Sequence, residues 1–167
     1  MAAVVLVVAG VSVVAWQLLK PNNHITANAT WTLKLNGKIS ETIDANTLIQ
    51  LTKASANGGA SWTDSDGYIY FGIPLWILVG RVDDTQPSGF NSTLADLGYL
   101  VRVKGSDGFY RDLTSASVKM NNDIIVVYEM DGKALPSNAY PLELVGAVPN
   151  KGWMVRLIAE IDIIFPS

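Results

Sequence analysis

Hydrophobic residues are distributed in two different ways along the chain. Residues 2–19 are almost continuously apolar, with no charged side chain and mostly Val, Leu and Ala. As an α-helix this stretch would be about 27 Å long, close to the thickness of the hydrocarbon core of a bilayer. Pro21 and the polar residues after it disfavour continuation of a helix. We therefore predict an apolar helix over residues 1–20 and a polar hinge over residues 21–29, with Pro21 at its start.

Three interpretations of the apolar segment compete. A removable signal peptide ranks third, because no Lys or Arg precedes the apolar run and the run is longer than is usual for a signal. A membrane anchor explains the hydrophobicity. Assembly with copies of itself also uses the small residues, which recur seven positions apart and would share one face of a helix. The residues expected to pack in such an assembly are Ala2, Ala3, Val5, Leu6, Val8, Ala9, Gly10 and Val13.

After the hinge, over residues 30–167, the pattern changes to alternation. Trp31, Leu33 and Leu35 alternate with polar residues before an Asn-Gly pair, which predicts a β-hairpin. Asp44 or Asn46 can cap a short helix that carries Leu48, Ile49 and Leu51 and ends at residues 57–59.

The rest of this region is predicted to consist mainly of strands. We predict a strand over residues 68–72, a helix from Pro74 to Gly80, a loop over residues 81–91, a hairpin centred on residues 106–108, and a buried strand and turn from residue 123. The final segment supplies two more strands, the last opened by a buried Trp153. In that strand we expect one face to carry Val155, Leu157, Ala159, Ile161 and Ile163. The fold class expected is α+β: an apolar N-terminal helix followed by a mainly β domain with short helices.

Composition narrows the chemistry of this domain. About 147 residues follow the apolar segment, enough for one domain with a real core. The formal net charge is −3 and the basic residues are scattered, which argues against a nucleic-acid partner. The sequence has no Cys, and its single histidine, His24, lies in the hinge. These facts exclude thiolate chemistry, a Ser-His-Asp triad inside the domain and any multi-histidine metal site.

Several local motifs each have two interpretations. Asp64 and Asp66 precede Gly67 as at the start of a calcium loop, but the later Glu is missing, so a β-turn is favoured. Asp83 and the residue after it could offer carboxylates to a cation, although a solvated loop is the simpler interpretation.

Two further groups of residues are candidates for surface chemistry. Asn28 and Asn91 begin glycosylation sequons in predicted loops, so we expect both side chains to be exposed and to carry glycans where the source cell glycosylates its surface proteins. Five aromatic residues could line a ligand cleft, with core packing as the default alternative. They are Trp62, Tyr68, Tyr70, Phe71 and Trp76.

The order of these pieces resembles a known family. It is the molybdopterin-binding domain of sulfite-oxidase-type oxidoreductases, in its small stand-alone form. The similar stretches are "WTLKLNGKIS", "DANTLIQL", "GYIYFGIPLWILV", "YLVRVKGSDGFYRDLT", "NNDIIVVYEMDGKAL" and "YPLELVGAVPNKGWMVRLIAEIDI". The resemblance implies a compact mixed fold dominated by strands. Enzymes of that family hold molybdenum through a cysteine thiolate, which this chain lacks. We therefore expect an inherited fold without catalytic, cofactor-binding or metal-binding residues, and not an enzyme.

The N-terminal segment carries a second resemblance. An apolar helix at the start of the chain is similar to the plan of type IV pilins and related archaeal filament proteins, and Val5 stands where bacterial pilins have Glu. The function expected is a structural subunit of an extracellular filament, a homopolymer anchored in the membrane before assembly. The alternative is a membrane-anchored extracytoplasmic module, derived from the pterin domain, that binds a ligand or a partner protein.

Overall fold

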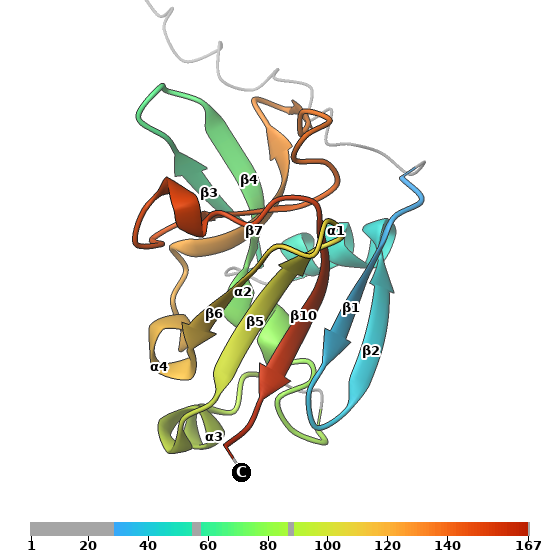
Figure 1. Ribbon diagram of the computed structural model, residues 1–167. Coiled ribbons are helices and arrows are strands. Elements are labelled where there is room, and N and C mark those ends of the chain that lie inside the picture. The colour runs from blue at the N-terminus through green and yellow to red at the C-terminus, as the bar shows by residue number, and fades with distance from the viewer. Residues whose placement is uncertain (1–28, 55–57, 87–88, 167) are drawn as a thin grey trace, which may run out of the picture.

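Two β-sheets form the framework of the protein in the computed structural model, which describes residues 29–54, 58–86 and 89–166 (Figure 1). The helix predicted over residues 1–20 and the hinge at Pro21 lie outside the described residues. Within the described ranges, no helix is long and apolar enough to cross a membrane. The domain is mostly β with a few short helices, which confirms the α+β class at that level.

The first sheet, sheet A, has the strand order β2-β1-β10-β5-β6. Its neighbouring strands are antiparallel except β1 and β10, which run parallel. The strands are β1 (Thr32–Asn36), β2 (Ser40–Asp44), β5 (Leu100–Gly105), β6 (Tyr110–Thr114) and β10 (Ile158–Ile164). Both predicted hairpins, around the Asn-Gly pair and around residues 106–108, are confirmed as β1–β2 and β5–β6.

The second sheet, sheet B, is built around one buried strand. Its members are β3 (Ala60–Thr63), β4 (Ile69–Pro74), β7 (Ile124–Met130), β8 (Lys133–Ala134) and β9 (Glu143–Gly146). β7 pairs with β4 along one side, and its two ends pair with β8 and β9. The continuous apolar run of β7 follows from burial of both its faces. Ile124, Val126 and Tyr128 enter the main core, whereas Ile125 and Val127 enter a smaller core.

Short helices fill the space around the sheets. They are α1 (Ala45–Lys53), α2 (Leu75–Val79), α3 (Ser92–Leu97), α4 (Ser115–Val118) and a 3-10 turn, η1 (Lys151–Trp153). Asp44 caps α1 as predicted, because its Oδ1 accepts a hydrogen bond from the Thr47 backbone N–H at 2.7 Å. Pro74 immediately precedes α2 and Gly80 follows it, also as predicted. The strand β3 and the helices α3 and α4 were not predicted from the sequence.

One hydrophobic core joins the inner face of sheet A to α1, α2 and sheet B. Its largest fully buried side chains include Leu33, Leu35, Ile43, Leu48, Ile73, Leu75, Leu78, Ile124, Leu142, Leu144 and Ile158. The other face of sheet A is polar. There the Asn36 amide donates hydrogen bonds to Glu160 and Asp162, at 2.9 and 2.7 Å. The two faces account for the alternation along these strands.

The prediction for the start of the final strand was wrong. β10 begins at Ile158, and Trp153 is a half-buried residue of η1. Leu157 has a φ of 55°, and the pairing register shifts between Ile158 and Glu160, so the chain cannot alternate regularly before that point. Ile161 and Ile163 are buried on one face, as expected.

Candidate functional site

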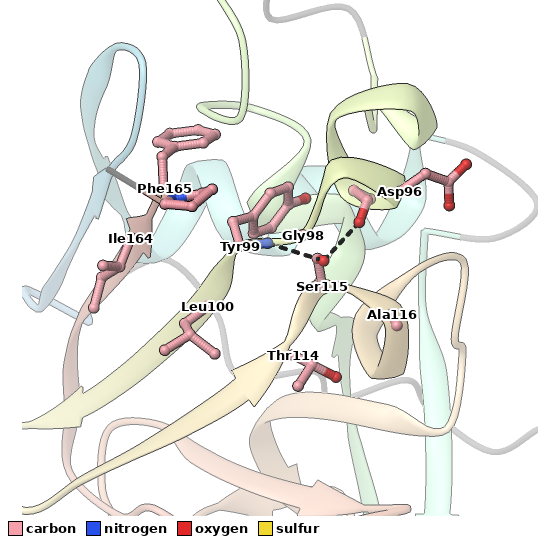
Figure 2. Close-up of a pocket in the computed structure, with 11 residues that line it drawn as sticks. Asp96, Gly98, Tyr99, Leu100, Thr114, Ser115, Ala116, Ile164 and Phe165 are labelled. Atoms are coloured by element: carbon pink, nitrogen blue, oxygen red, sulfur yellow. Dashed lines mark hydrogen bonds between the residues drawn. The ribbon is translucent and has the colours of Figure 1, made fainter.

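An apolar pocket of about 510 Å³ opens at the end of sheet A where β10 finishes (Figure 2). We call it the C-terminal pocket. Four segments that are distant in sequence form it: α3, the start of β5, the junction of β6 with α4, and the residues after β10. Its lining residues are Ala95, Asp96, Gly98, Tyr99, Leu100, Thr114, Ser115, Ala116, Ile164, Phe165 and Pro166.

Ser115 ties together two walls of the pocket. Its hydroxyl donates a hydrogen bond to the carbonyl of Ala95 at 2.7 Å and accepts one from the backbone N–H of Tyr99 at 3.2 Å (Figure 2). Both hydrogen bonds of this hydroxyl are made to the backbone, so within the described residues its role is structural. The residue holds the shape of the pocket.

Aromatic and aliphatic side chains make the pocket apolar. The rings of Tyr99 and Phe165 meet at a centroid distance of 5.5 Å and an angle of 60°. Leu100 and Ile164, direct partners in the β5–β10 pairing, remain 38% and 37% exposed at the mouth. Large aliphatic residues exposed in this way provide an apolar contact surface. The pocket is suited to an apolar ligand group or an apolar side chain of a partner.

A buried carboxylate lies in the loop before α3. Asp83 was expected in a solvated loop, but it is fully buried, and that expectation was wrong. Its Oδ2 accepts a hydrogen bond from the Asn91 backbone N–H at 2.7 Å, while its Oδ1 and the hydroxyl of Tyr99 have no hydrogen-bond partner among the described residues. Burial raises the pKa of the Asp83 carboxyl, and burial together with the Asp83 charge raises the pKa of Tyr99.

The sequon at Asn91 has a structural role. The Asn91 side chain is half-buried rather than fully exposed, and its oxygen caps α3 by accepting a hydrogen bond from Leu94 N–H at 3.0 Å. Its amide donates to Asp84 Oδ2 at 2.8 Å. Asn28 lies outside the described residues, as do the predicted assembly residues and His24. Glycosylation of either asparagine stays a prediction.

The five candidate aromatic residues separate into two groups. Trp62, Tyr68 and Tyr70 line a cleft of about 340 Å³ beside the β3–β4 hairpin. Phe71 and Trp76 pack against the main core, where Trp76 meets Phe90 edge to face. Core packing, the default interpretation, therefore applies to Phe71 and Trp76, whereas Trp62 and Tyr70 both line the cleft and pack against the smaller core.

The predicted turn at Asp64 is confirmed. Its Oδ1 accepts hydrogen bonds from the backbone N–H groups of Asp66 and Tyr68, both at 2.9 Å, and Gly67 has a φ of 88°. These bonds describe an Asx-type turn between β3 and β4. No group of three or more His, Cys, Asp or Glu residues in the described ranges could hold a metal ion.

Comparisons with known proteins bear on the fold alone. No protein-family model matches the chain, and no curated protein matches it. Among solved structures, the chain is similar to the sulfane dehydrogenase SoxCD from Paracoccus pantotrophus, with a TM-score of 0.57 and 15% sequence identity. The match covers 93% of this chain and 50% of that chain, so this chain corresponds to half the length of its neighbour. The likeness supports the fold expected from the resemblance to a molybdopterin-binding domain.

The donor groups of this chain do not fit a molybdenum cofactor held through a thiolate. The sequence contains no Cys, and a soft sulfur ligand cannot be replaced by the oxygen ligands of Ser or Asp without changing the preferred metal.

The C-terminal pocket was not predicted from the sequence, although one signal for part of it was present. Asn91 precedes the short segment "STLADL", and Gly98 follows it. An Asn at the N-cap position and a Gly past the end are typical of a helix. The prediction treated Asn91 only as a glycosylation acceptor and so missed α3.

Proposed function

We propose that the chain is a structural subunit of an extracellular, pilus-like filament. In this proposal the helix predicted over residues 1–20 packs against copies of itself in the filament core, and the β-rich domain is displayed outside. The subunit is anchored in the membrane before assembly.

The observation that best supports the proposal is the almost continuously apolar sequence of residues 2–19, which joins the domain at the end of sheet A opposite the C-terminal pocket. The described chain enters the domain at residue 29, just before β1, and β1 runs parallel to β10 (Figure 1). The pocket lies where β10 ends, at the opposite end of sheet A. The five residues of β1 alone span about 16 Å.

Electron microscopy of the purified full chain tests the proposal. We expect filaments, and we expect Gly10→Leu to prevent them, because added bulk at a close helix approach keeps neighbouring helices apart. Ser106→Leu is the control, since it adds a similar side chain at an exposed turn of the domain. Dispersed particles for the unmodified chain under all conditions would refute the filament.

A second function is favoured by the pocket itself. An apolar hollow of about 510 Å³ with exposed aliphatic residues at its mouth suits a membrane-anchored module that binds an apolar ligand or a partner protein. This function predicts single particles in lipid or detergent, with the apolar segment touching no second copy. The same microscopy therefore distinguishes the two functions.

A further inference from the structure

The cleft beside the β3–β4 hairpin brings together aromatic rings and charged side chains. We call it the hairpin cleft. Trp62 and Tyr70 are direct partners in the antiparallel pairing, so their side chains share one face of the sheet. Their ring centroids are 5.5 Å apart, with the planes tilted by 40°. Tyr68, two residues before Tyr70, is 47% exposed and lines the same cleft.

Two ion pairs line the rest of the hairpin cleft. Arg156 Nε donates a hydrogen bond to Glu143 Oε1 at 2.9 Å, and the Glu143 side chain is only 6% exposed whereas that of Arg156 is 53% exposed. Lys151 Nζ lies 3.8 Å from Asp66 Oδ2. Asp64 also lines the cleft. Apart from the tyrosines, the ionisable side chains of the hairpin cleft are therefore three acids and two bases.

This balance of charge selects among ligand classes. The three carboxylates repel a phosphate or sulfate ester. The two cations repel a quaternary ammonium group, which the aromatic rings would otherwise attract. The Tyr70 phenol is protonated at neutral pH, as tyrosines ordinarily are, and burial with the charges of Glu143 and Asp64 raises its pKa further. The cleft therefore offers flat apolar rings beside hydrogen-bond donors and acceptors, with little net charge.

We infer that the hairpin cleft binds a neutral carbohydrate. One face of a pyranose ring carries C–H groups of partial positive charge, which pack against the negative face of an aromatic ring. The hydroxyl groups at its edge both donate and accept hydrogen bonds, as the carboxylates, the Arg156 guanidinium and the tyrosine hydroxyls require. This binding does not depend on whether the chain polymerises, so its failure would leave the filament proposal standing.

Calorimetric titration of the full chain with cellotriose, N,N′,N″-triacetylchitotriose and mannotriose tests the inference. The chain is kept in a detergent without a sugar headgroup. We expect at least one of these oligosaccharides to bind, and Tyr68→Ala to weaken that binding by roughly tenfold. Tyr68 is exposed at a turn, so its truncation leaves the fold intact. Phe109→Ala is the matched control, because Phe109 is also an exposed aromatic residue next to a hairpin turn but does not line the cleft.

Three outcomes would overturn the inference. One is the absence of any heat signal with all three oligosaccharides. Another is binding that Tyr68→Ala and Trp62→Ala leave unchanged. The third is binding of tetramethylammonium in place of the sugars, which would identify the hairpin cleft as a cation cage.

Discussion

Replacing Gly72 with Ala should strongly destabilise the domain, because β4 and β7 approach too closely for a side chain at this position. A Cβ added to Gly72 would lie 2.1 Å from the carbonyl oxygen of Val126 and 2.5 Å from the Cα of Val127. These are backbone atoms of a strand that is buried on both faces. The pairing register shifts between Phe71 and Gly72, so the close approach is part of a local irregularity.

The expected loss of stability follows from the kind of atom that must move. Overpacking a core costs typically 1–3 kcal/mol even when a side chain can rotate away, and the backbone of β7 cannot rotate. A gain of up to about 1 kcal/mol from the stiffer unfolded chain offsets part of this cost. We expect a net loss of about 3 kcal/mol in the free energy of unfolding, which lowers the melting temperature by roughly 6–12 °C.

Urea and thermal unfolding of the full chain, followed by near-ultraviolet circular dichroism, measure the effect. Gly67→Ala is the control, because Gly67 has no neighbouring heavy atom within 4 Å of the added Cβ but has a φ of 88°. It should lose only about 1 kcal/mol, the cost of a left-handed backbone conformation for an L-residue. Equal losses in the two variants, or no loss in Gly72→Ala, would refute the close approach of β4 and β7.

Three further predictions concern the buried acid, Trp153 and the missing metal. The raised pKa of Asp83 means that the folded state keeps this proton to higher pH than the unfolded state, so its contribution favours folding at low pH and is lost as pH rises through the folded pKa. Urea unfolding should therefore show the wild type losing stability relative to Asp83→Asn as pH rises above about 4, the usual pKa of an Asp carboxyl; a difference that stays constant with pH would contradict this. Trp153→Ala should cost about 2 kcal/mol, less than a fully buried Trp, because the ring is half-buried and 5.8 Å from the Arg111 guanidinium; a loss of zero in thermal unfolding would show that the ring is exposed. Elemental analysis should find no stoichiometric molybdenum and assays no sulfite- or sulfoxide-directed activity, and stoichiometric metal would overturn the argument from the missing thiolate.

The elements predicted correctly are those with a strong local signal. Alternation with an Asn-Gly turn identified β1 and β2, and Asp44 identified the start of α1, because both signals act within a few residues. The helices α3 and α4 have six and four residues, too few for a hydrophobic period to be visible. Their caps were the remaining signal.

The hairpin cleft and the C-terminal pocket differ in how far the sequence could predict them. Three aromatic residues of the hairpin cleft lie within nine positions on one hairpin, so the sequence could suggest it. The C-terminal pocket joins segments more than 60 residues apart, and nothing in the sequence alone shows that residues 95–100 meet residues 164–166. The burial of Asp83 could not be predicted either, because the loop that carries it folds back so that the Asn91 backbone N–H, eight residues later, meets its carboxylate.

A likeness in fold to an oxidoreductase is compatible with the absence of a thiolate, because the described domain has an extensive apolar core of its own. In a small domain with little core, a bound metal supplies part of the folding free energy, and losing the ligands unfolds the chain. Here one apolar core joins both sheets, α1 and α2, and it contains fully buried leucine, isoleucine and valine side chains from nearly every strand. Each such side chain contributes about 1.5–3 kcal/mol. Loss of a metal ligand would therefore remove the reactions that the metal supports but leave the domain folded. The C-terminal pocket and the hairpin cleft would then remain available to bind other ligands.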